Sequence, residues 1–551
     1  MPTKGEAMQA GAAANTTSAD IDAVIAAVEA GDRAGATALA RAALDRGNRQ
    51  PLFLNLRAFW HEQNGRLSAA LADLEHAHAL APDDVPVLNA LGLCRDRLGR
   101  AREAFDAFDR AVALAPGFAP ALMNRGRVLE ALGDFDRAAI SYGSALKLGH
   151  NAHAELAALA ARRADWETAR LHARAALAIR PGFVMAEHVL AQVEMAEGDY
   201  GTAKGRLTRI LDHAPPSAPE RATTLSLLGD ALDGAGDFRA AFQSYEAGNA
   251  ARIEALTVAG DSAARDRMHV HLERLTDYFG KLAPGAFVAP VSHAGGNEAG
   301  PQHHVFLLGF ARSGTTLLEE TLAAHSAVAT TQEKDGLQEA VANLFLNTPG
   351  FDQLMVLKGG GLTRYRRSYW QTLAAFGIPT GGTCLIDKQP YNTIRLPLIA
   401  KLFPAATILF ALRDPRDVVL SCFRRRFVMN DSNRPLLTLE GAARFYDSVM
   451  RLAGIYRAKL PLNLIEVRHE DLVGDFAGEM RRICSHIGIP WSDDLATFTG
   501  RRRAVTTPSA VQLHEGLSAR GVGFWRNYAR ELGPVLPILA PWVARFGYPA
   551  E

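Results

Sequence analysis

This chain of 551 residues has few cysteines, almost no net charge and no long apolar runs. Its four cysteines, Cys94, Cys384, Cys422 and Cys484, are too scattered for a zinc pattern and too few for a disulfide framework. A reducing, cytoplasmic location without a metal site is therefore expected. The formal net charge of +1 argues against a dedicated nucleic-acid-binding protein. No apolar run reaches the length of a transmembrane segment, and residues 1–18 lack the apolar core of a signal peptide.

A lysine is also missing, from a segment that otherwise has the spacing of a phosphate-binding loop. An apolar run ends at Gly309, and after four intervening residues Gly314, Thr315 and Thr316 open an expected helix. Backbone N–H groups and a helix N-terminus favour an anion there. Thr315 stands where a P-loop has its triphosphate-binding lysine, so a phosphosulfate is favoured over a magnesium nucleoside triphosphate. The candidate ligand-binding residues are Arg312, Ser313, Gly314, Thr315 and Thr316.

A second pair of phosphate-binding candidates follows the apolar run 406–412. Arg413 falls at the carboxyl end of this expected parallel strand, where open α/β sheets bind ligands. Ser421 lies about two helical turns further on, and a guanidinium with a hydroxyl supplies several donors to one phosphate. Arg416 and Asp417 are expected to form a solvated pair at the start of that helix.

These two segments resemble the sulfotransferases. Their R/K-S-G-T-T-L/W loop, similar to Arg312–Leu317 here, holds the 5′-phosphosulfate of 3′-phosphoadenosine 5′-phosphosulfate (PAPS). The pair Arg413 and Ser421 is similar to their grip on the 3′-phosphate. The resemblance implies transfer of the sulfuryl group from PAPS to a hydroxyl without a metal. It leaves the acceptor open among tyrosine in a peptide or protein, a saccharide and a small phenol.

The same resemblance implies the catalytic groups. Glu333 lies 21 residues after Arg312, which is the spacing of the catalytic Glu in tyrosylprotein sulfotransferases, and is the implied base. The neighbouring residue, commonly acidic in that family, is Gln332 here. Lys388 resembles the lysine of the family's K-x-P stretch, which would neutralise the leaving oxygen. Arg312 is the further catalytic cation.

The C-terminal part resembles the family's nucleotide cover. Ser509 ends a T-P-S stretch and is implied to contact PAPS. The later S-V-G-R/K-W-R-x-Y stretch departs from the family at two places, where Gly521 replaces Ser and Phe524 replaces the basic residue. Either that basic contact is absent, or Arg520 or Arg526 replaces it.

Residues 19–252 are self-similar with a period near 34. One copy carries its characteristic residues at Leu88, Leu91, Gly92, Gly99, Ala104, Phe108, Ala111 and Pro116. Small residues let two helices approach closely and the proline ends the second helix, so each unit is a helical hairpin that stacks on its neighbours. The segment resembles a tetratricopeptide array of six or seven repeats. It implies a surface that binds a protein partner or recruits the acceptor.

The chain is therefore predicted to be multidomain. A disordered tail (1–18) precedes an all-α tetratricopeptide solenoid (19–252) and a helix with a linker (253–301). An α/β P-loop-like sulfotransferase domain with a parallel sheet (302–551) follows.

Two other classes of function remain open. A nucleotide-dependent kinase would use the same strand, loop and helix, but Thr315 in place of lysine disfavours it. A repeat scaffold with an inactive nucleotide-binding domain is the other alternative. The joint presence of the candidate residues speaks against it: Arg312, Glu333, Lys388, Arg413 and Ser421.

Overall fold

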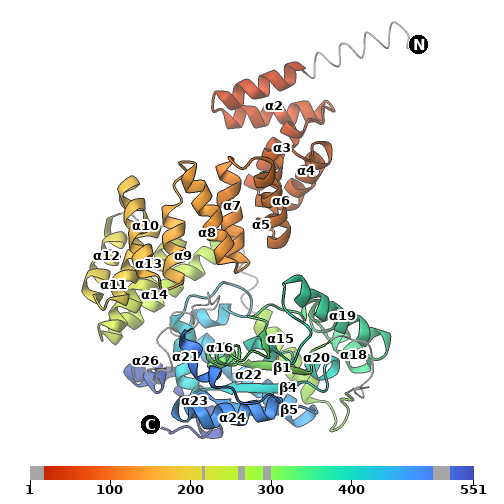
Figure 1. The fold of residues 1–551 in the computed structure, drawn as a ribbon, viewed down its shortest axis with the longest axis vertical. Helices are drawn as coiled ribbons and strands as arrows, with labels where there is room; N and C mark the ends of the chain where they lie inside the picture. The colour runs from red at the N-terminus through yellow and green to blue at the C-terminus, as the bar shows by residue number, and fades with distance from the viewer. Residues whose placement is uncertain (1–17, 214–216, 259–266, 290–299, 501–520) are drawn as a thin grey trace. The chain divides into compact units, whose positions relative to one another are not determined.

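The chain folds into two compact units (Figure 1). The computed structural model describes residues 18–213, 217–258, 267–289, 300–500 and 521–551. Unit 1 comprises residues 1–161 and 167–186, and unit 2 comprises residues 162–166 and 187–551. Within the described ranges, no helix combines the length and apolarity that crossing a membrane requires.

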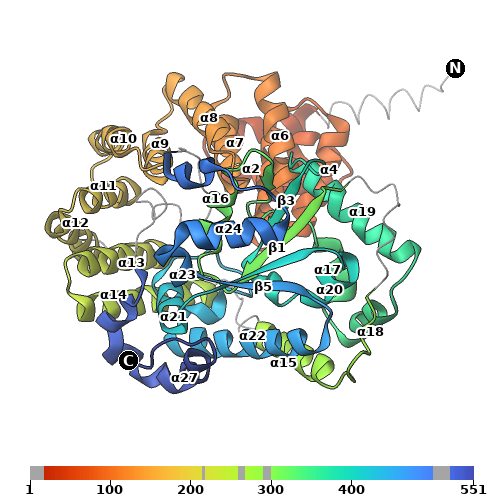
Figure 2. The same ribbon diagram turned by 60° about the horizontal axis from the view of Figure 1, so that its bottom comes forward.

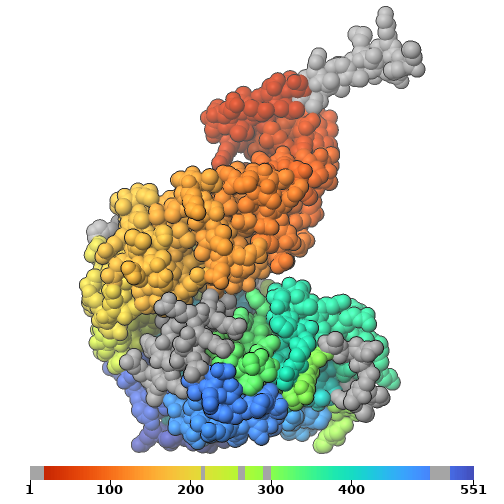
Figure 3. Space-filling view, in the orientation of Figure 1, coloured from red at the N-terminus to blue at the C-terminus, as the bar shows by residue number. Residues whose placement is uncertain are grey.

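Unit 1 is a stack of helical hairpins. Figure 3 shows the surfaces of its helices following one another in chain order, from red to orange. Their bounds are α2 Arg33–Asp45, α3 Pro51–Gln63, α4 Leu67–Leu80, α5 Val85–Arg97, α6 Ala101–Leu114, α7 Ala119–Ala131, α8 Phe135–Lys147, α9 His153–Arg162 and α10 Trp166–Ile179, with the start of α11 Val184–Ala196. This region is the predicted all-α repeat solenoid.

Glycine permits the close packing inside a hairpin. A Cβ atom on Gly92 of α5 would lie 2.6 Å from the ring of Phe108 on α6, and one on Gly126 would lie 2.5 Å from the ring of Tyr142. Real Cβ atoms do not approach rings so closely, so each ring occupies the space that the glycine leaves free. The glycines that recur with the repeat period are therefore required by the packing of the two helices of a hairpin.

Unit 2 begins with the last repeats, built from the rest of α11, α12 Tyr200–His213, α13 Ala218–Gly234 and α14 Phe238–Val258. Residues 253–258, predicted to begin a separate helix, continue α14 instead. The predicted linker helix is α15 Arg267–Gly280, which buries Leu272, Leu275 and Phe279.

The sheet of unit 2 has five parallel strands in the order β2-β3-β1-β4-β5. Their bounds are β1 His303–Gly309, β2 Val328–Thr330, β3 Cys384–Lys388, β4 Thr407–Leu412 and β5 Asn463–Arg468. The apolar runs at β1, β3 and β4 are buried, as strands covered on both faces require. The predicted parallel α/β architecture is confirmed.

Successive residues of β1 enter different cores. Val305 and Leu307 pack with α16 Thr315–Leu322 and α24 Phe476–Ile487, whereas Phe306 and Leu308 pack in the larger core with α15 and α22 Leu439–Lys459. Figure 2 shows α24 on one side of the sheet and α15 and α22 on the other. The larger core also contains Leu232 and Tyr245 of the last repeat.

The remaining elements of unit 2 surround this sheet. They are α17 Gln338–Leu344, α18 Thr348–Val356, α19 Gly360–Ala375, η2 Pro390–Thr393, α20 Leu396–Leu402, α21 Pro415–Arg424, η3 Arg434–Leu437, α23 His469–Gly474, η4 Asp493–Gly500, η6 Phe524–Tyr528, α26 Ala529–Leu532, η7 Gly533–Val535 and α27 Leu536–Arg545.

Candidate active site

The predicted phosphate loop joins β1 to α16. Gly314 precedes the helix with φ +94°, and a Cβ atom on it would lie 2.9 Å from Nδ1 of His469. Both conformation and space therefore require glycine. Ser313, Thr315 and Thr316 are buried. Because Gly314 has no side chain, no capping side chain covers the start of α16, and this helix end can accept an anion.

Arg413 and Ser421 meet the loop at Arg312. The Nε of Arg312 donates to Oγ of Ser421 at 3.0 Å, and Nη1 of Arg413 donates to the backbone oxygen of Arg312 at 3.4 Å. Strand β4 delivers Arg413, and α21 presents Ser421 two turns after its start. The structure thus brings together residues predicted for the two ends of one donor molecule.

This cluster is strongly positive. Burial, with repulsion from Arg425 and Arg413, lowers the pKa of Arg312 to about 9. The Nε of Arg413 is buried and has no hydrogen-bond partner among the described residues. An unpartnered buried donor beside several guanidinium groups fits a ligand that carries phosphate groups.

The predicted base and the predicted lysine form an ion pair. Lys388 lies at the end of β3 with a fully buried side chain, and its Nζ contacts Oε1 of Glu333. The same Nζ lies 3.1 Å from Oε2 of Glu319, a buried residue of α16. Burial opposes the charge on Lys388, but the two carboxylates outweigh it and raise the pKa of Lys388. Burial raises the pKa of Glu319.

Glu319 was not identified from the sequence as a site residue. It lies on the buried face of α16, one turn after Thr315, whereas its neighbour Glu320 is only partly buried. Two adjacent glutamates on a short helix are typical of a solvated surface. Its position on the same helical face as Thr315 and Leu322 is the signal that could have distinguished it.

The backbone is strained where Glu333 is held. Within the described ranges, four non-glycine residues have a left-handed φ, and three of them lie in this site: Arg312 at +70°, Gln332 at +49° and Glu333 at +66°. The N–H of Gln332 donates to Oε1 of Glu319 at 3.0 Å, which helps to hold this conformation. Such strain is concentrated at functional sites.

A cavity of about 300 Å³ connects the loop to Glu333. Arg312, Thr315 and Thr316 line it on the loop side. Polar and aromatic groups line the opposite side, among them Gln389, Tyr391, Asn433 and an ion pair of 2.8 Å between Arg395 and Asp335. The cavity has space for a small reacting group between Arg312 and Glu333.

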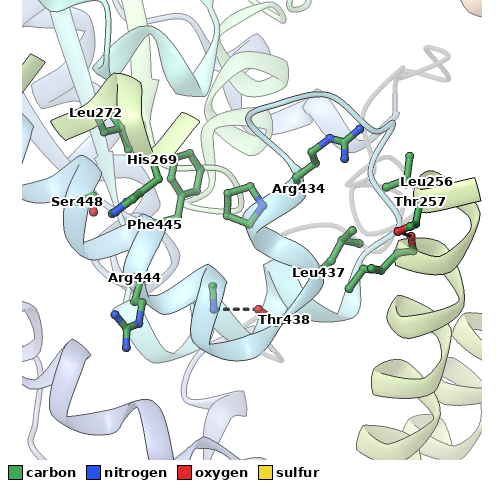
Figure 4. Close-up of a pocket in the computed structure, with 13 residues that line it drawn as sticks. Leu256, Thr257, His269, Leu272, Arg434, Leu437, Thr438, Arg444, Phe445 and Ser448 are labelled. Carbon is green, nitrogen blue, oxygen red and sulfur yellow. Dashed lines mark hydrogen bonds between the residues drawn. The ribbon is translucent and has the colours of Figure 1, made fainter. Parts of the chain in front are cut away.

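A larger cavity of about 380 Å³ shares no lining residue with the first one (Figure 4). It lies between α14, α15 and the start of α22, and Leu272, Leu437 and Phe445 give it a mainly apolar lining. None of the predicted site residues lines it, so the smaller cavity is the candidate active site.

The expectation of a solvated pair at Arg416 and Asp417 was wrong. Both residues are 2% exposed. The carboxylate of Asp417 accepts the backbone N–H groups of Gly523 and Trp525, each at 2.7 Å, and the guanidinium of Arg416 lies 3.9 Å from the ring of Trp525. The C-terminal segment covers the start of α21, which the local sequence does not reveal.

The predicted nucleotide cover is described only in part. Ser509 and Arg520 lie outside the described residues. Arg526 donates to the backbone oxygen of Glu551 at 2.8 Å, and no contact links it to Arg312 or Arg413 among the described residues. Phe524 packs against Arg424.

Comparison with known proteins agrees with the predicted resemblance. Residues 304–493 match the model of the sulfotransferase family, and residues 119–148 match that of the tetratricopeptide repeat. No group of three or more metal-binding side chains is present in the described part of the chain.

Three relatives show how far the similarity extends. Protein-tyrosine sulfotransferase 1 of Danio rerio is 24% identical over 264 residues, covering 44% of this chain and 72% of the relative. An uncharacterized protein of Aquifex aeolicus is 23% identical, covering 43% of this chain and 32% of the relative. Omega-hydroxy-beta-dihydromenaquinone-9 sulfotransferase of Mycobacterium tuberculosis is 26% identical, covering 19% of this chain and 29% of the relative. The chain thus spans about a third or less of two of these relatives.

Proposed function

The chain is a tetratricopeptide-repeat protein with a sulfotransferase-family domain, and we propose that this domain transfers the sulfuryl group of PAPS to an acceptor hydroxyl. The observation that carries the proposal is the single cavity that Arg312, Thr315, Thr316 and Glu333 share. Phosphate-binding groups and a carboxylate then face one reaction space.

In the proposed reaction, a bond forms between the acceptor oxygen and sulfur. The bond from sulfur to the oxygen that bridges it to the 5′-phosphate breaks, and 3′-phosphoadenosine 5′-phosphate (PAP) leaves. Glu333 accepts the proton of the hydroxyl. Lys388 and Arg312 supply positive charge for the leaving oxygen. The loop with Ser313, Gly314, Thr315 and Thr316 holds the 5′ end, and Arg413, Ser421 and Ser509 hold the rest of the donor.

Glu319 has a defined part in this mechanism. Glu333 must leave Lys388 when it takes the acceptor proton, and Glu319 then remains beside the buried ammonium. Because an unpaired buried charge is costly, Glu319 keeps Lys388 charged through the step.

We propose only that the acceptor is a compound with a hydroxyl group. The names of two relatives give a protein tyrosine and a dihydromenaquinone as their acceptors, so the family resemblance does not select one class. We assign the repeats to recruitment of a macromolecular acceptor or a partner protein, because stacked repeats create extended binding surfaces.

Titration with PAP in the absence of metal tests the donor half. Binding is expected, and Arg413→Ala should weaken it by about 1–3 kcal/mol because charged hydrogen bonds are lost. Arg444→Ala, at an exposed side chain of α22 that does not line this cavity, is the control and should leave the affinity unchanged. Binding of magnesium ATP without binding of PAP would contradict the proposal and favour a kinase.

A further inference from the structure

One carboxylate of the last repeat contacts two elements of the catalytic domain. Asp233, near the end of α13, accepts from Nη2 of Arg424 at 2.6 Å through one oxygen and from the hydroxyl of Tyr528 through the other. Arg424 is the last residue of α21, and Tyr528 is the last residue of η6. The side chains of Asp233 and Arg424 are each 15% exposed, so water screens this pair poorly.

Aromatic rings surround the guanidinium of Arg424. Its centre lies 4.7 Å from the ring of Phe524, 5.3 Å from that of Tyr245 and 5.4 Å from that of Tyr528. Burial opposes its charge, but Tyr245 and Asp233 outweigh the burial and raise the pKa of Arg424. Arg424 therefore stays charged and depends on Asp233 for compensation.

Helix α14 holds the same end of α21. Nδ2 of Asn249 donates to the backbone oxygen of Phe423 at 3.0 Å, and the ring of Phe242 stacks on that of Phe423 with centroids 5.1 Å apart. The end of α21 is thus fixed by both helices of the last repeat.

The elements fixed in this way carry donor-site residues. Ser421, which accepts from Arg312, lies one turn before Arg424 on α21. The segment that ends at Tyr528 begins at Gly521, whose backbone oxygen accepts from Arg413. Asp233 is therefore connected to the donor site by two short routes.

We propose that Asp233 is a positioning residue for the donor site, so that the last repeat sets the affinity for the donor nucleotide. The inference rests on the proposed function. Glu333 follows β2 and Lys388 ends β3, and among the described residues neither forms a side-chain hydrogen bond or ion pair with α21 or with residues 521–528. Loss of Asp233 is therefore expected to weaken donor binding more than it slows the chemical step.

The test is titration with PAP of three full-length proteins: the original chain, Asp233→Asn and Asp230→Asn. Asp233→Asn leaves Arg424 buried without its carboxylate, and PAP should bind about tenfold more weakly, within the usual range of coupling between sites. Asp230→Asn is the control, because Asp230 lies one turn earlier on α13 and accepts from Tyr245 at 2.9 Å, and among the described residues it forms no hydrogen bond with Arg424 or Tyr528. Its affinity for PAP should stay within twofold of the original.

Kinetic measurements distinguish a positioning role of Asp233 from a general destabilisation of the fold. In Asp233→Asn the KM for PAPS should rise while kcat at saturation changes by less than about threefold. Tyr528→Phe is the milder variant, used should Asp233→Asn not fold, since it keeps the ring and removes only the bond to Asp233. It should weaken PAP binding severalfold.

Two results would overturn the inference: unchanged PAP affinity in a folded Asp233→Asn or Tyr528→Phe, or an equal loss in Asp230→Asn. Failure of the original chain to bind PAP would instead reject the proposed function. Hydrogen exchange adds an independent readout, because PAP should slow exchange in α13 of the original chain and not in Asp233→Asn.

Discussion

Lys388 combines complete burial with two carboxylate partners of different exposure. Glu319 is 2% exposed in its side chain and Glu333 is 36% exposed. The more exposed carboxylate faces the cavity and is free to exchange its partner, whereas the buried one is fixed. In the proposed mechanism, this asymmetry lets Glu333 act on the acceptor while Glu319 maintains the charge of Lys388.

Glu333→Gln keeps the shape of the side chain and removes the base. Turnover should fall by about 10²- to 10⁴-fold, while PAP affinity changes little. Steady-state kinetics with a saturating acceptor measure this effect. Glu339→Gln, at a partly exposed glutamate of α17 paired with Arg364, is the control and should retain full turnover. Near-normal turnover in Glu333→Gln would mean that another group accepts the proton.

Asp387 makes stability depend on pH. It lies next to Lys388 on β3, and its carboxylate accepts from the hydroxyl of Tyr369 at 2.7 Å. Burial raises its pKa to about 7 from an ordinary value of 3.8. The folded chain therefore holds more protons than the unfolded chain between these values, so stability falls as the pH rises through this window and is level above it.

Asp387→Asn carries no charge and should lose this part of the pH dependence. At pH 8 the variant is expected to be more stable than the original chain, by a difference on the order of 4 kcal/mol at most. Urea unfolding followed at several pH values measures it. A smaller dependence should remain, because burial also raises the pKa of Asp417 to about 6. A pH profile identical in both proteins would contradict the assignment.

At the scale of elements, the hairpins of unit 1 depend on where glycine lies. Gly126→Ala should destabilise the array by about 1–3 kcal/mol, because the new Cβ atom would overlap the ring of Tyr142. Gly143→Ala, on the neighbouring helix α8, meets no atom within 4 Å and should stabilise the array by up to about 1 kcal/mol. Thermal unfolding of the two variants compares them, and effects of the same sign would contradict this packing.

Local patterns predicted the elements well. The repeat period, the apolar strands and the glycine-rich loop are signals within a few residues, and they located α5 to α8, β1 and β4 correctly. Burial caused by distant segments was beyond local patterns. The pair Asp233 and Arg424 is separated by 191 residues, and the cover of Asp417 lies more than 100 residues away. From the neighbouring sequence alone, a charged residue is expected to be solvated. These contacts are therefore visible only in the structure.

At the scale of the whole molecule, the repeats do not end where the core of the α/β domain begins. Leu232, Tyr245, Leu272, Leu275 and Phe279 lie in the same core as Phe306 of β1. The last repeat and α15 are therefore structural parts of the α/β domain, although their sequence pattern is that of a repeat and a connecting helix.

A chain of residues 285–551 lacks these core residues. It should show no cooperative thermal transition and no PAP binding, since removal of each large apolar side chain from a core costs several kcal/mol. A chain of residues 187–551, which retains the last repeat, should fold and bind PAP with the original affinity. Circular dichroism and titration distinguish the two. A folded 285–551 chain with unchanged affinity would contradict the shared core.

The 187–551 chain also tests recruitment by the earlier repeats. Its kcat should be retained, and its KM for a macromolecular acceptor should rise because uniform binding is lost. If the 187–551 chain and the full chain have the same KM for this acceptor, unit 1 has a function other than acceptor recruitment.

The proposed sulfuryl transfer takes place in the cavity that Glu333 lines. Its most direct test is transfer of label from sulfur-labelled PAPS to a panel of tyrosine peptides, saccharides and phenols, without metal, by the full chain and by Glu333→Gln. We predict labelled product in at least one acceptor class, release of PAP in equal amount, and loss of both in the variant. Retention of all label in PAPS with every acceptor class, by a folded chain that binds PAP, would contradict the claim.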